Sequence, residues 1–183
     1  MSLRAPNTGV LYLGVSGVLH PSRNLYEMLK GKAPEADGHR EYEGVGALEA
    51  LLCGWPQIRI VLTSTQTWLK GLAAVMELLG PELSSRVLGD TYCDLTTKAQ
   101  LGPRRAPLGH ADYWRHTKAE IVRAHAAWLR PAAWIAIDDD SLLWSQEEQR
   151  QKLVLVNGCE GLLAPSAQDR LLTVLEENFG RPA

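Results

Sequence analysis

Four short runs of mainly apolar residues recur along the chain, and small or acidic polar residues end three of them. The runs are residues 10–15, 58–63, 133–137 and 153–156. Such runs, without alternation of apolar and polar residues, are typical of strands buried on both faces, as in a parallel sheet. The polar residues that end the first three runs are Ser16-Gly17, Thr63-Ser64-Thr65 and Asp138-Asp139-Asp140. We therefore expect these groups at the carboxyl ends of parallel strands, where open α/β sheets hold their ligands.

Apolar residues at helical spacing lie between the predicted strands. They form two stripes: Val45, Leu48, Leu51 and Leu52, then Trp68, Leu72, Val75, Met76 and Leu79. The first stripe ends near Gly54 and Pro56, and the second ends at Gly80-Pro81, which are residues typical of helix C-termini. Each stripe predicts one amphipathic helix.

Two sequence patterns of the capping-box type predict the starts of two further helices. Thr117 and Glu120 frame a helix that runs to about Leu129, and Ser166 and Asp169 frame a helix near the end of the chain. Strands and helices thus alternate along the sequence. This alternation predicts an α/β fold with a mainly parallel sheet, right-handed crossovers and helices on both faces.

Two stretches do not follow this alternation. Residues 21–42 contain glycines, a proline and mixed charges, and we interpret them as a mobile flap with at most a short helix. Residues 94–116 form a long basic loop, and loops of such length commonly act as lids or mobile segments. Neither stretch has the length of a separate cap domain, so we expect one domain over residues 1–183 with a minimal cap.

Composition narrows the class of protein. A chain of 183 residues with 45% hydrophobic and 22% charged residues has the composition of a compact globular domain rather than a disordered chain. No apolar run approaches the roughly 20 residues of a membrane span, and the first residues lack the apolar core of a signal peptide. The 19 basic and 21 acidic residues give no electrostatic reason to expect a nucleic-acid or membrane partner. Three cysteines without metal-ligand spacing favour free thiols and a cytoplasmic location.

The polar residues at the predicted strand ends resemble the four motifs of the haloacid dehalogenase (HAD) superfamily of phosphohydrolases. The first motif of that superfamily is Asp-x-Asp-Gly-Val at the end of the first strand, and here the stretch reads Gly14-Val15-Ser16-Gly17-Val18. The other motifs correspond to Thr63, to Lys118 at a helix start and to Asp138-Asp139. The resemblance extends from residue 10 to about residue 175 and points to the HAD domain of Swiss Army Knife RNA repair proteins. It implies a three-layer, Rossmann-like HAD fold.

The first motif departs from the superfamily at its two catalytic positions. Gly14 stands where active members have the aspartate that attacks phosphorus and binds Mg²⁺. Ser16 stands where they have the aspartate that acts as general acid and base. A glycine has no side chain, and a serine hydroxyl is a poor acid or base near neutral pH. The resemblance therefore implies a pseudoenzyme that has lost several powers of ten in rate.

Part of the ligand chemistry of the superfamily remains in this chain. The residues that the resemblance assigns to phosphate binding are Ser16, Gly17, Thr63, Ser64 and Lys118. They supply backbone N–H groups, hydroxyls and an ammonium at a helix start, where the helix dipole also favours an anion. The metal ligands that remain are Asp138 and Asp139. Without the aspartate at position 14, Mg²⁺ loses a shared ligand, so we expect weak binding of this cofactor.

Each of these residues also has a purely structural interpretation. Ser16 can be a turn residue, and Thr63 and Ser64 can be a strand end followed by a helix cap. Three consecutive carboxylates at residues 138–140 repel one another unless a positive charge compensates them. Lys118 is the structural answer to this repulsion, and a bound cation is the functional answer.

The remaining candidates are histidines and tryptophans. The five histidines lack zinc-ligand spacing, so we expect most of them at the surface, and we single out only His116, beside the predicted cap at Thr117. Trp114 and Trp144 lie in predicted loops near the strand ends, where they could stack on a base or contact a partner.

The leading hypothesis is a HAD-like domain without phosphohydrolase activity that binds a phosphorylated small molecule or a protein partner. One alternative is a phosphatase in which Asp138 and Asp139 hold a metal-activated water. Another is a nucleophile mutant engineered from an active phosphatase, which a single sequence does not distinguish from natural loss. A role in RNA repair follows from the resemblance alone.

Overall fold

Five parallel strands form one sheet in the computed structural model, which describes residues 8–91 and 115–182. The strand order is β3-β2-β1-β4-β5. The strands are β1 (Gly9–Leu13), β2 (Arg59–Leu62), β3 (Val87–Asp90), β4 (Ala133–Asp138) and β5 (Leu153–Leu155). The α/β class and the parallel sheet are confirmed. Strand β3 was not predicted, because only two apolar residues precede its Gly89-Asp90 end.

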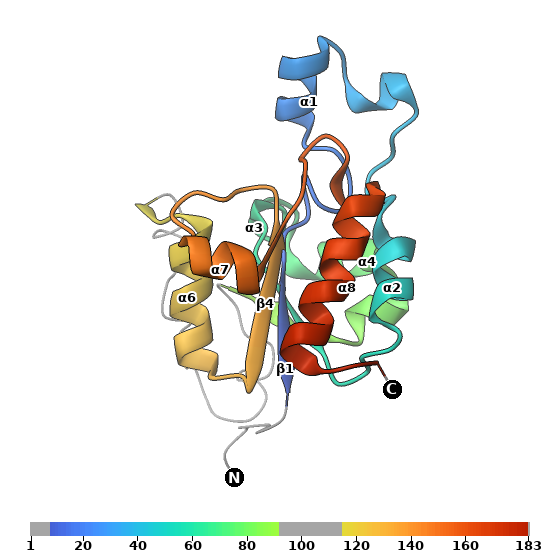
Figure 1. The fold of residues 1–183 in the computed structure, drawn as a ribbon. Coiled ribbons are helices and arrows are strands. Elements are labelled where there is room, and N and C mark those ends of the chain that lie inside the picture. Colours follow the sequence, from blue (N-terminus) through green and yellow to red (C-terminus); the bar gives the residue numbers. More distant parts are fainter. Residues whose placement is uncertain (1–7, 92–114, 183) are drawn as a thin grey trace.

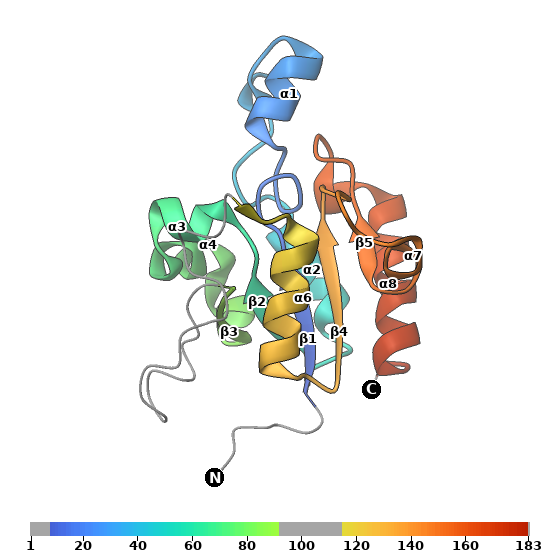
Figure 2. The same ribbon diagram turned by 90° about the vertical axis from the view of Figure 1, so that its left-hand side faces the viewer.

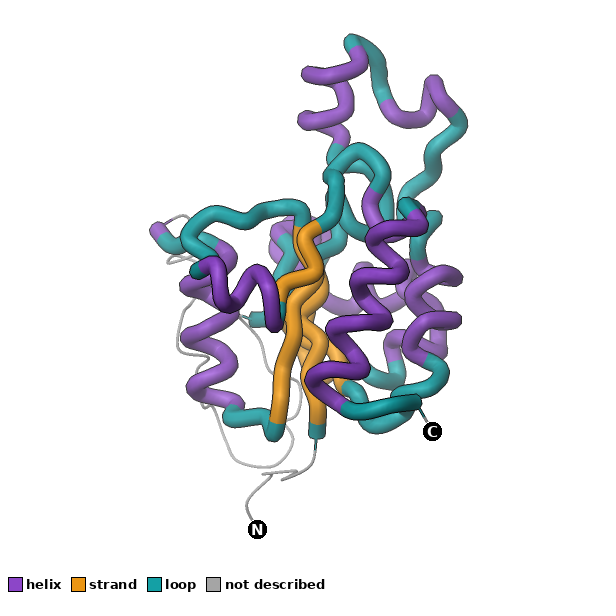
Figure 3. The backbone as a smooth tube through the Cα atoms, in the orientation of Figure 1, coloured by secondary structure: helices purple, strands orange, loops and turns teal. Residues whose placement is uncertain are grey.

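Helices cover both faces of the sheet (Figures 1 and 2). Helices α6 (Lys118–Leu129) and α7 (Gln146–Gln151) lie on one face, and helices α2 (Val45–Leu52), α4 (Leu72–Ser84) and α8 (Pro165–Phe179) lie on the other. The tube in Figure 3 shows the strands between these two layers. The arrangement is the three-layer, Rossmann-like architecture expected above.

Strand β1 explains why the predicted strands are continuously apolar. Leu11 and Leu13 belong to the core cluster that includes residues of α2, α4 and α8. Val10 and Tyr12 belong to the second cluster, which includes residues of α6. Successive side chains of a strand point to opposite faces, so a strand covered on both faces needs apolar residues at every position.

The helix starts and ends are only partly as predicted. The Thr117 capping box is confirmed, with reciprocal bonds between Thr117 and Glu120 at the start of α6. The capping box at Ser166 is wrong: α8 begins at Pro165, whose fixed φ suits the first helical position, and Ala164 provides no side-chain cap. The second apolar stripe is divided between α3 (Thr65–Lys70) and α4. Gly80 has a non-helical φ of 76° and kinks α4, so the regular helix ends there as predicted, and one further turn from Pro81 to Ser84 follows the kink.

Residues 21–42 project beyond the carboxyl ends of the strands (Figures 1 and 2). They contain α1 (Arg23–Lys30) and the short 3-10 helix η1 (Pro34–Asp37), and we keep the name flap for them. The Tyr26 hydroxyl donates a 2.7 Å hydrogen bond to Asp37, which connects the two helices. A second 3-10 helix, η3 (Gly161–Leu163), precedes α8. Most of the predicted basic loop, 94–116, lies outside the described residues.

The sheet topology places a crevice between β1 and β4. The chain fills one side of β1 with β2 and β3 and then crosses to the other side for β4 and β5. Open α/β sheets hold ligands at the carboxyl ends of the strands where the order reverses in this way. Among the helices of the described ranges, none has the length and apolar character needed to cross a bilayer.

Candidate functional site

Three of the predicted site positions meet at the carboxyl ends of β1, β2 and β4. The Gly14 N–H donates to Ile137 O at 2.9 Å, and the Thr63 N–H donates to Leu13 O at 2.9 Å. These bonds continue the parallel ladders beyond the ends of the strands. Gly14, Thr63 and Asp138 are therefore neighbours, as the predicted motif order requires.

Asp138 fills the space that a side chain at position 14 would occupy. A Cβ at Gly14 would lie 2.7 Å from Oδ2 of Asp138 and 3.0 Å from Cγ2 of Val18. Both contacts are closer than carbon atoms of real side chains tolerate without a shift of the neighbour. Asp138 is 4% exposed, so its carboxylate lies within the protein rather than in solvent. The Asp138 carboxylate thus packs against the position that a side chain at residue 14 would occupy.

Lys118 holds the Asp138 carboxylate. Its Nζ lies 3.1 Å from Oδ2 of Asp138 and also donates to the backbone oxygen of Thr63. The other carboxylate oxygen, Oδ1, accepts the Asp140 N–H at 3.1 Å. The capping box at Thr117 fixes the start of α6 and thereby the origin of the Lys118 side chain. The structure therefore contains the Lys118–Asp138 ion pair that the structural interpretation of Lys118 predicts.

Asp139 lies against two glycines. A Cβ at Gly17 would lie 2.1 Å from Oδ2 of Asp139, and a Cβ at Gly158 would lie 2.5 Å from the same atom. Gly17 also has a φ of 80°, in the left-handed region that favours glycine. Burial, with a smaller contribution from the charge of Asp138, raises the pKa of Asp139 to about 6, although Lys118 opposes this rise. Part of the Asp139 population is thus protonated at mildly acidic pH.

The other residues predicted to bind phosphate do not all face the same space. Ser16 lines a cavity beneath the flap. The Gly17 N–H donates to His20 O at 2.8 Å, so that donor is directed within the protein. The Ser64 hydroxyl caps α3 by accepting the Gln66 N–H at 3.1 Å, as its structural interpretation requires. Of these groups, only Ser16 is among the residues that line the cavity.

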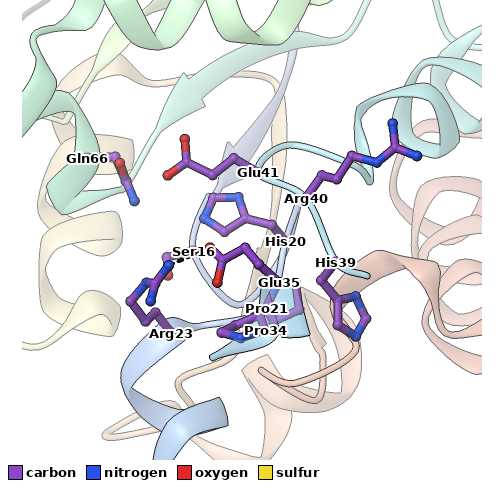
Figure 4. Close-up of a pocket in the computed structure, with 10 residues that line it drawn as sticks. All are labelled: Ser16, His20, Pro21, Arg23, Pro34, Glu35, His39, Arg40, Glu41 and Gln66. Atoms are coloured by element: carbon purple, nitrogen blue, oxygen red, sulfur yellow. Dashed lines mark hydrogen bonds and ion pairs between the residues drawn. The ribbon is translucent and has the colours of Figure 1, made fainter. Parts of the chain in front are cut away.

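This cavity lies between the flap and the strand ends (Figure 4), with a volume of about 220 Å³. Its lining residues are Ser16, His20, Pro21, Arg23, Pro34, Glu35, His39, Arg40, Glu41 and Gln66. The sequence analysis missed His20, which is 8% exposed rather than at the surface. A signal was available, because His20 follows the first motif directly and therefore had to lie where the flap leaves the sheet.

The candidate Trp144 and the buried His125 both have structural roles in the described ranges. Trp144 is 5% exposed and packs against Trp134 at a centroid distance of 6.3 Å, so it is not placed to stack on a base. His125 is also buried, and its Nδ1 lies 3.0 Å from the Tyr12 hydroxyl. His116 lies 3.8 Å from Glu120 at the start of α6. Trp114 lies outside the described residues.

The donor set at the strand ends does not fit Mg²⁺, the ion that the superfamily uses. Gly14 supplies no carboxylate, and Lys118 already binds Oδ2 of Asp138. Within residues 8–91 and 115–182, no three His, Cys, Asp or Glu side chains are grouped so that they could hold a metal. Hard, octahedral Mg²⁺ requires several oxygen ligands that face a common point. Here the Lys118 ammonium lies 3.1 Å from Oδ2 of Asp138 and also donates to the backbone oxygen of Thr63.

One of the comparisons with known proteins agrees with the family resemblance. The family model described as "HAD domain in Swiss Army Knife RNA repair proteins" matches residues 10–167. Comparisons with curated proteins and with solved structures gave no significant match. The matched residues include β1 from its second residue, the other four strands and every position of the four motifs. This chain therefore belongs to the family of HAD domains found in Swiss Army Knife RNA repair proteins.

Proposed function

We propose that this HAD-family domain binds a phosphorylated ligand at the strand ends without hydrolysing it through an aspartyl-phosphate. One observation carries the proposal: the position of the nucleophile is a glycine, and the Asp138 carboxylate lies within 2.7 Å of where its Cβ would be. This space is filled, and the filling carboxylate is held by Lys118 at 3.1 Å.

The loss of hydrolysis follows from the chemistry of the residues that remain. An aspartyl-phosphate needs a carboxylate at position 14, and proton transfer to the leaving group needs an acid at position 16. Asp138 does not replace the first, because both of its oxygens accept hydrogen bonds from within the protein. Ser16 does not replace the second, because a serine hydroxyl is far too weak an acid to release its proton to the leaving group near neutral pH.

Retention of phosphate binding is supported by the donors that surround the crevice. Ser16 faces the cavity, and Lys118 carries a positive charge near the junction of β1, β2 and β4. The carboxylates of Asp138 and Asp139 oppose an anion, but protonation of Asp139 removes one of these charges. We therefore expect sulfate, an anion whose own charge does not change over this range, to bind more tightly at pH 5.5 than at pH 8.

An activity assay and a binding assay together test this proposal. With p-nitrophenyl phosphate and Mg²⁺, we expect no turnover above a blank without protein. Calorimetry with inorganic phosphate at pH 5.5 should detect binding that Lys118→Met abolishes and Lys30→Met, at an exposed lysine of α1 that does not line the cavity, does not. Turnover that depends on Mg²⁺ and is lost in Asp138→Asn would contradict the proposal and support hydrolysis by a metal-activated water.

A gain-of-function variant tests whether the rest of the site is still arranged for catalysis. Gly14→Asp with Ser16→Asp restores the two missing carboxylates beside Thr63, Lys118 and Asp138. We expect this double variant to hydrolyse p-nitrophenyl phosphate measurably when Mg²⁺ is present, and each single variant to stay near the blank. Equal turnover in the wild type and the double variant would contradict the proposal.

A further inference from the structure

The flap cavity has a polarity that restricts the ligand it can bind. Hydrogen-bond donors come from the body of the domain, where Ser16, His20 and Gln66 line the cavity. The flap contributes the carboxylates of Glu35 and Glu41 and also Arg23 and Arg40 (Figure 4). Arg23 is paired with Glu35, and the Arg40 guanidinium points away from His20 and Glu35 in this view. A ligand that fits both sides therefore carries acceptors toward the strand ends and hydroxyl groups, which both donate and accept, toward the flap.

His20 is held in one orientation. Its Nδ1 accepts the backbone N–H of Tyr42 at 3.2 Å, and its ring packs on the Tyr42 ring at a centroid distance of 5.2 Å. Its backbone oxygen accepts the Gly17 N–H at 2.8 Å. His20 therefore connects the turn after β1 with the residue at which the flap returns to the body.

These contacts determine the tautomer of His20. Since Nδ1 accepts a hydrogen bond, the proton of the neutral ring is on Nε2, and Nε2 can only donate. Burial lowers the pKa of His20, although Glu41 opposes this effect, so the ring stays neutral at neutral pH. His20 is thus a fixed N–H donor in the cavity wall, suited to a phosphate or hydroxyl oxygen.

The flap carboxylates favour hydroxyl donors over ammonium groups. Glu35 already pairs with Arg23, and Glu41 lies 3.0 Å from Nζ of Lys70. A carboxylate whose charge is compensated gains little from a second cation, but its remaining lone pairs can accept hydroxyl groups. The volume of about 220 Å³ lies below the roughly 300–1,000 Å³ of pockets for larger organic ligands. The ligand is therefore compact.

We propose that the flap cavity binds a phosphorylated polyol of sugar-phosphate size, with Nε2–H of His20 donating to the ligand and the Glu35 and Glu41 carboxylates accepting its hydroxyls. This inference rests on the proposed function, because it places the phosphate beside Ser16. Beyond the proposed function, the inference adds the class of the ligand and names His20 as a residue that should favour this ligand over inorganic phosphate.

Calorimetry with ribose 5-phosphate, inorganic phosphate and phosphoethanolamine tests the ligand class. We expect ribose 5-phosphate to bind at least tenfold more tightly than either other probe. Equal affinity for ribose 5-phosphate and inorganic phosphate would overturn this inference and leave the proposed function standing. Tighter binding of phosphoethanolamine, or of a 5′-phosphorylated oligoribonucleotide, would also overturn it. Absence of binding by every probe would overturn the proposed function as well.

Two substitutions at His20 separate the donor from the structural contact. In His20→Asn the amide oxygen can still accept the Tyr42 N–H, but no donor remains at the position of Nε2. We expect this variant to bind ribose 5-phosphate about tenfold more weakly or worse, which is the effect of one hydrogen bond to a charged acceptor. His20→Gln keeps a donor near that position and should recover part of the affinity. Equal loss in both variants would show that His20 has only a structural role.

A second position keeps the test informative if the His20 variants do not fold. Glu41 is exposed, so its replacement leaves the core unchanged. We expect Glu41→Ala to weaken ribose 5-phosphate severalfold and to leave inorganic phosphate unchanged. Glu77→Ala, at an exposed residue of α4 that does not line the cavity, is the matched control and should change neither affinity. Unchanged affinity for ribose 5-phosphate in Glu41→Ala would overturn the role of the flap carboxylates.

Discussion

The ion pair at the strand ends is largely buried, whereas the ion pair in the flap is exposed. At the strand ends, the Lys118 and Asp138 side chains are only 18% and 6% exposed. In the flap, the paired Arg23 and Glu35 side chains are 56% and 53% exposed. Breaking a buried pair leaves an uncompensated charge in a poorly solvated place, whereas exposed pairs contribute about 0–1 kcal/mol and exchange partners easily. The surroundings of Gly14 are therefore fixed by a buried ion pair, whereas the ion pairs beside the flap cavity can exchange partners.

Of the variants considered, Gly14→Asp should destabilise the strand ends most strongly. The new carboxylate would have to displace Asp138 from Lys118, and two buried carboxylates would share one ammonium. We expect a loss of about 4 kcal/mol or more in unfolding free energy without divalent ions, measured by urea denaturation. Magnesium should restore part of this loss, because two carboxylates then face a common point.

Gly14→Ala is the matched control for that variant. Its Cβ meets the same Asp138 oxygen but adds no charge, so it should be destabilised less and should not respond to magnesium. If Gly14→Asp were as stable as the wild type in EDTA, the packing of Asp138 described here would be contradicted.

Lys118→Met tests the same pair from the other side, with a smaller expected effect. Removing the ammonium leaves Asp138 and Asp139 uncompensated, which should cost about 3 kcal/mol of unfolding free energy. Magnesium should raise the melting temperature of this variant but not that of the wild type, because Oδ2 of Asp138 is then no longer paired with an ammonium. Lys70→Met, which removes an exposed pair with Glu41, should cost less than about 1 kcal/mol. A similar loss in both variants would remove the distinction between the two regions.

The sequence predicts the scaffold of the strand ends better than the flap cavity, for a physical reason. The apolar runs and the polar residues that end them placed Gly14, Thr63 and Asp138 at neighbouring strand ends, because parallel strands covered on both faces leave a strong pattern. The filling of the Gly14 position by Asp138 has no such pattern, because it depends on side-chain packing in three dimensions. The role of His20 depends on Tyr42, which is 22 residues further along the chain. Strand β3 was missed because its edge position and its glycine require few apolar residues.

Asp139 should make the strand ends less stable as the pH rises, which is opposite in sign to the effect of His20, whose lowered pKa favours the folded state as the pH rises. The folded pKa of Asp139, about 6, lies above the ordinary value of 3.8, so the folded state favours the neutral form. The stability that this preference contributes is fully present below about pH 4 and is lost as the pH rises through 6. Asp139→Asn should therefore be more stable than the wild type at pH 8, by about 1–2 kcal/mol after solvent screening. The two proteins should be equally stable at pH 4.

Melting curves of Asp139→Asn and Asp140→Asn from pH 4 to pH 8 measure this difference. Asp140 accepts the Leu142 N–H in a turn, and an asparagine there keeps an oxygen for that bond. We expect no comparable gain at pH 8 for Asp140→Asn. A constant difference between Asp139→Asn and the wild type at every pH would contradict the pKa shift of Asp139.

The smallest effect on stability is expected for Glu35→Ala in the flap, which we compare with Lys118→Met at the strand ends. Glu35→Ala removes an exposed partner of Arg23, which still has Glu27 at 3.0 Å, so unfolding free energy should change by less than about 0.5 kcal/mol. The same substitution removes a hydroxyl acceptor from the cavity and should weaken ribose 5-phosphate severalfold in calorimetry. Lys118→Met should show a large loss of stability in the same denaturation assay. If Glu35→Ala also destabilised the fold by several kcal/mol, the flap would be part of the rigid structure, and its carboxylates would not be free to reorient toward a ligand.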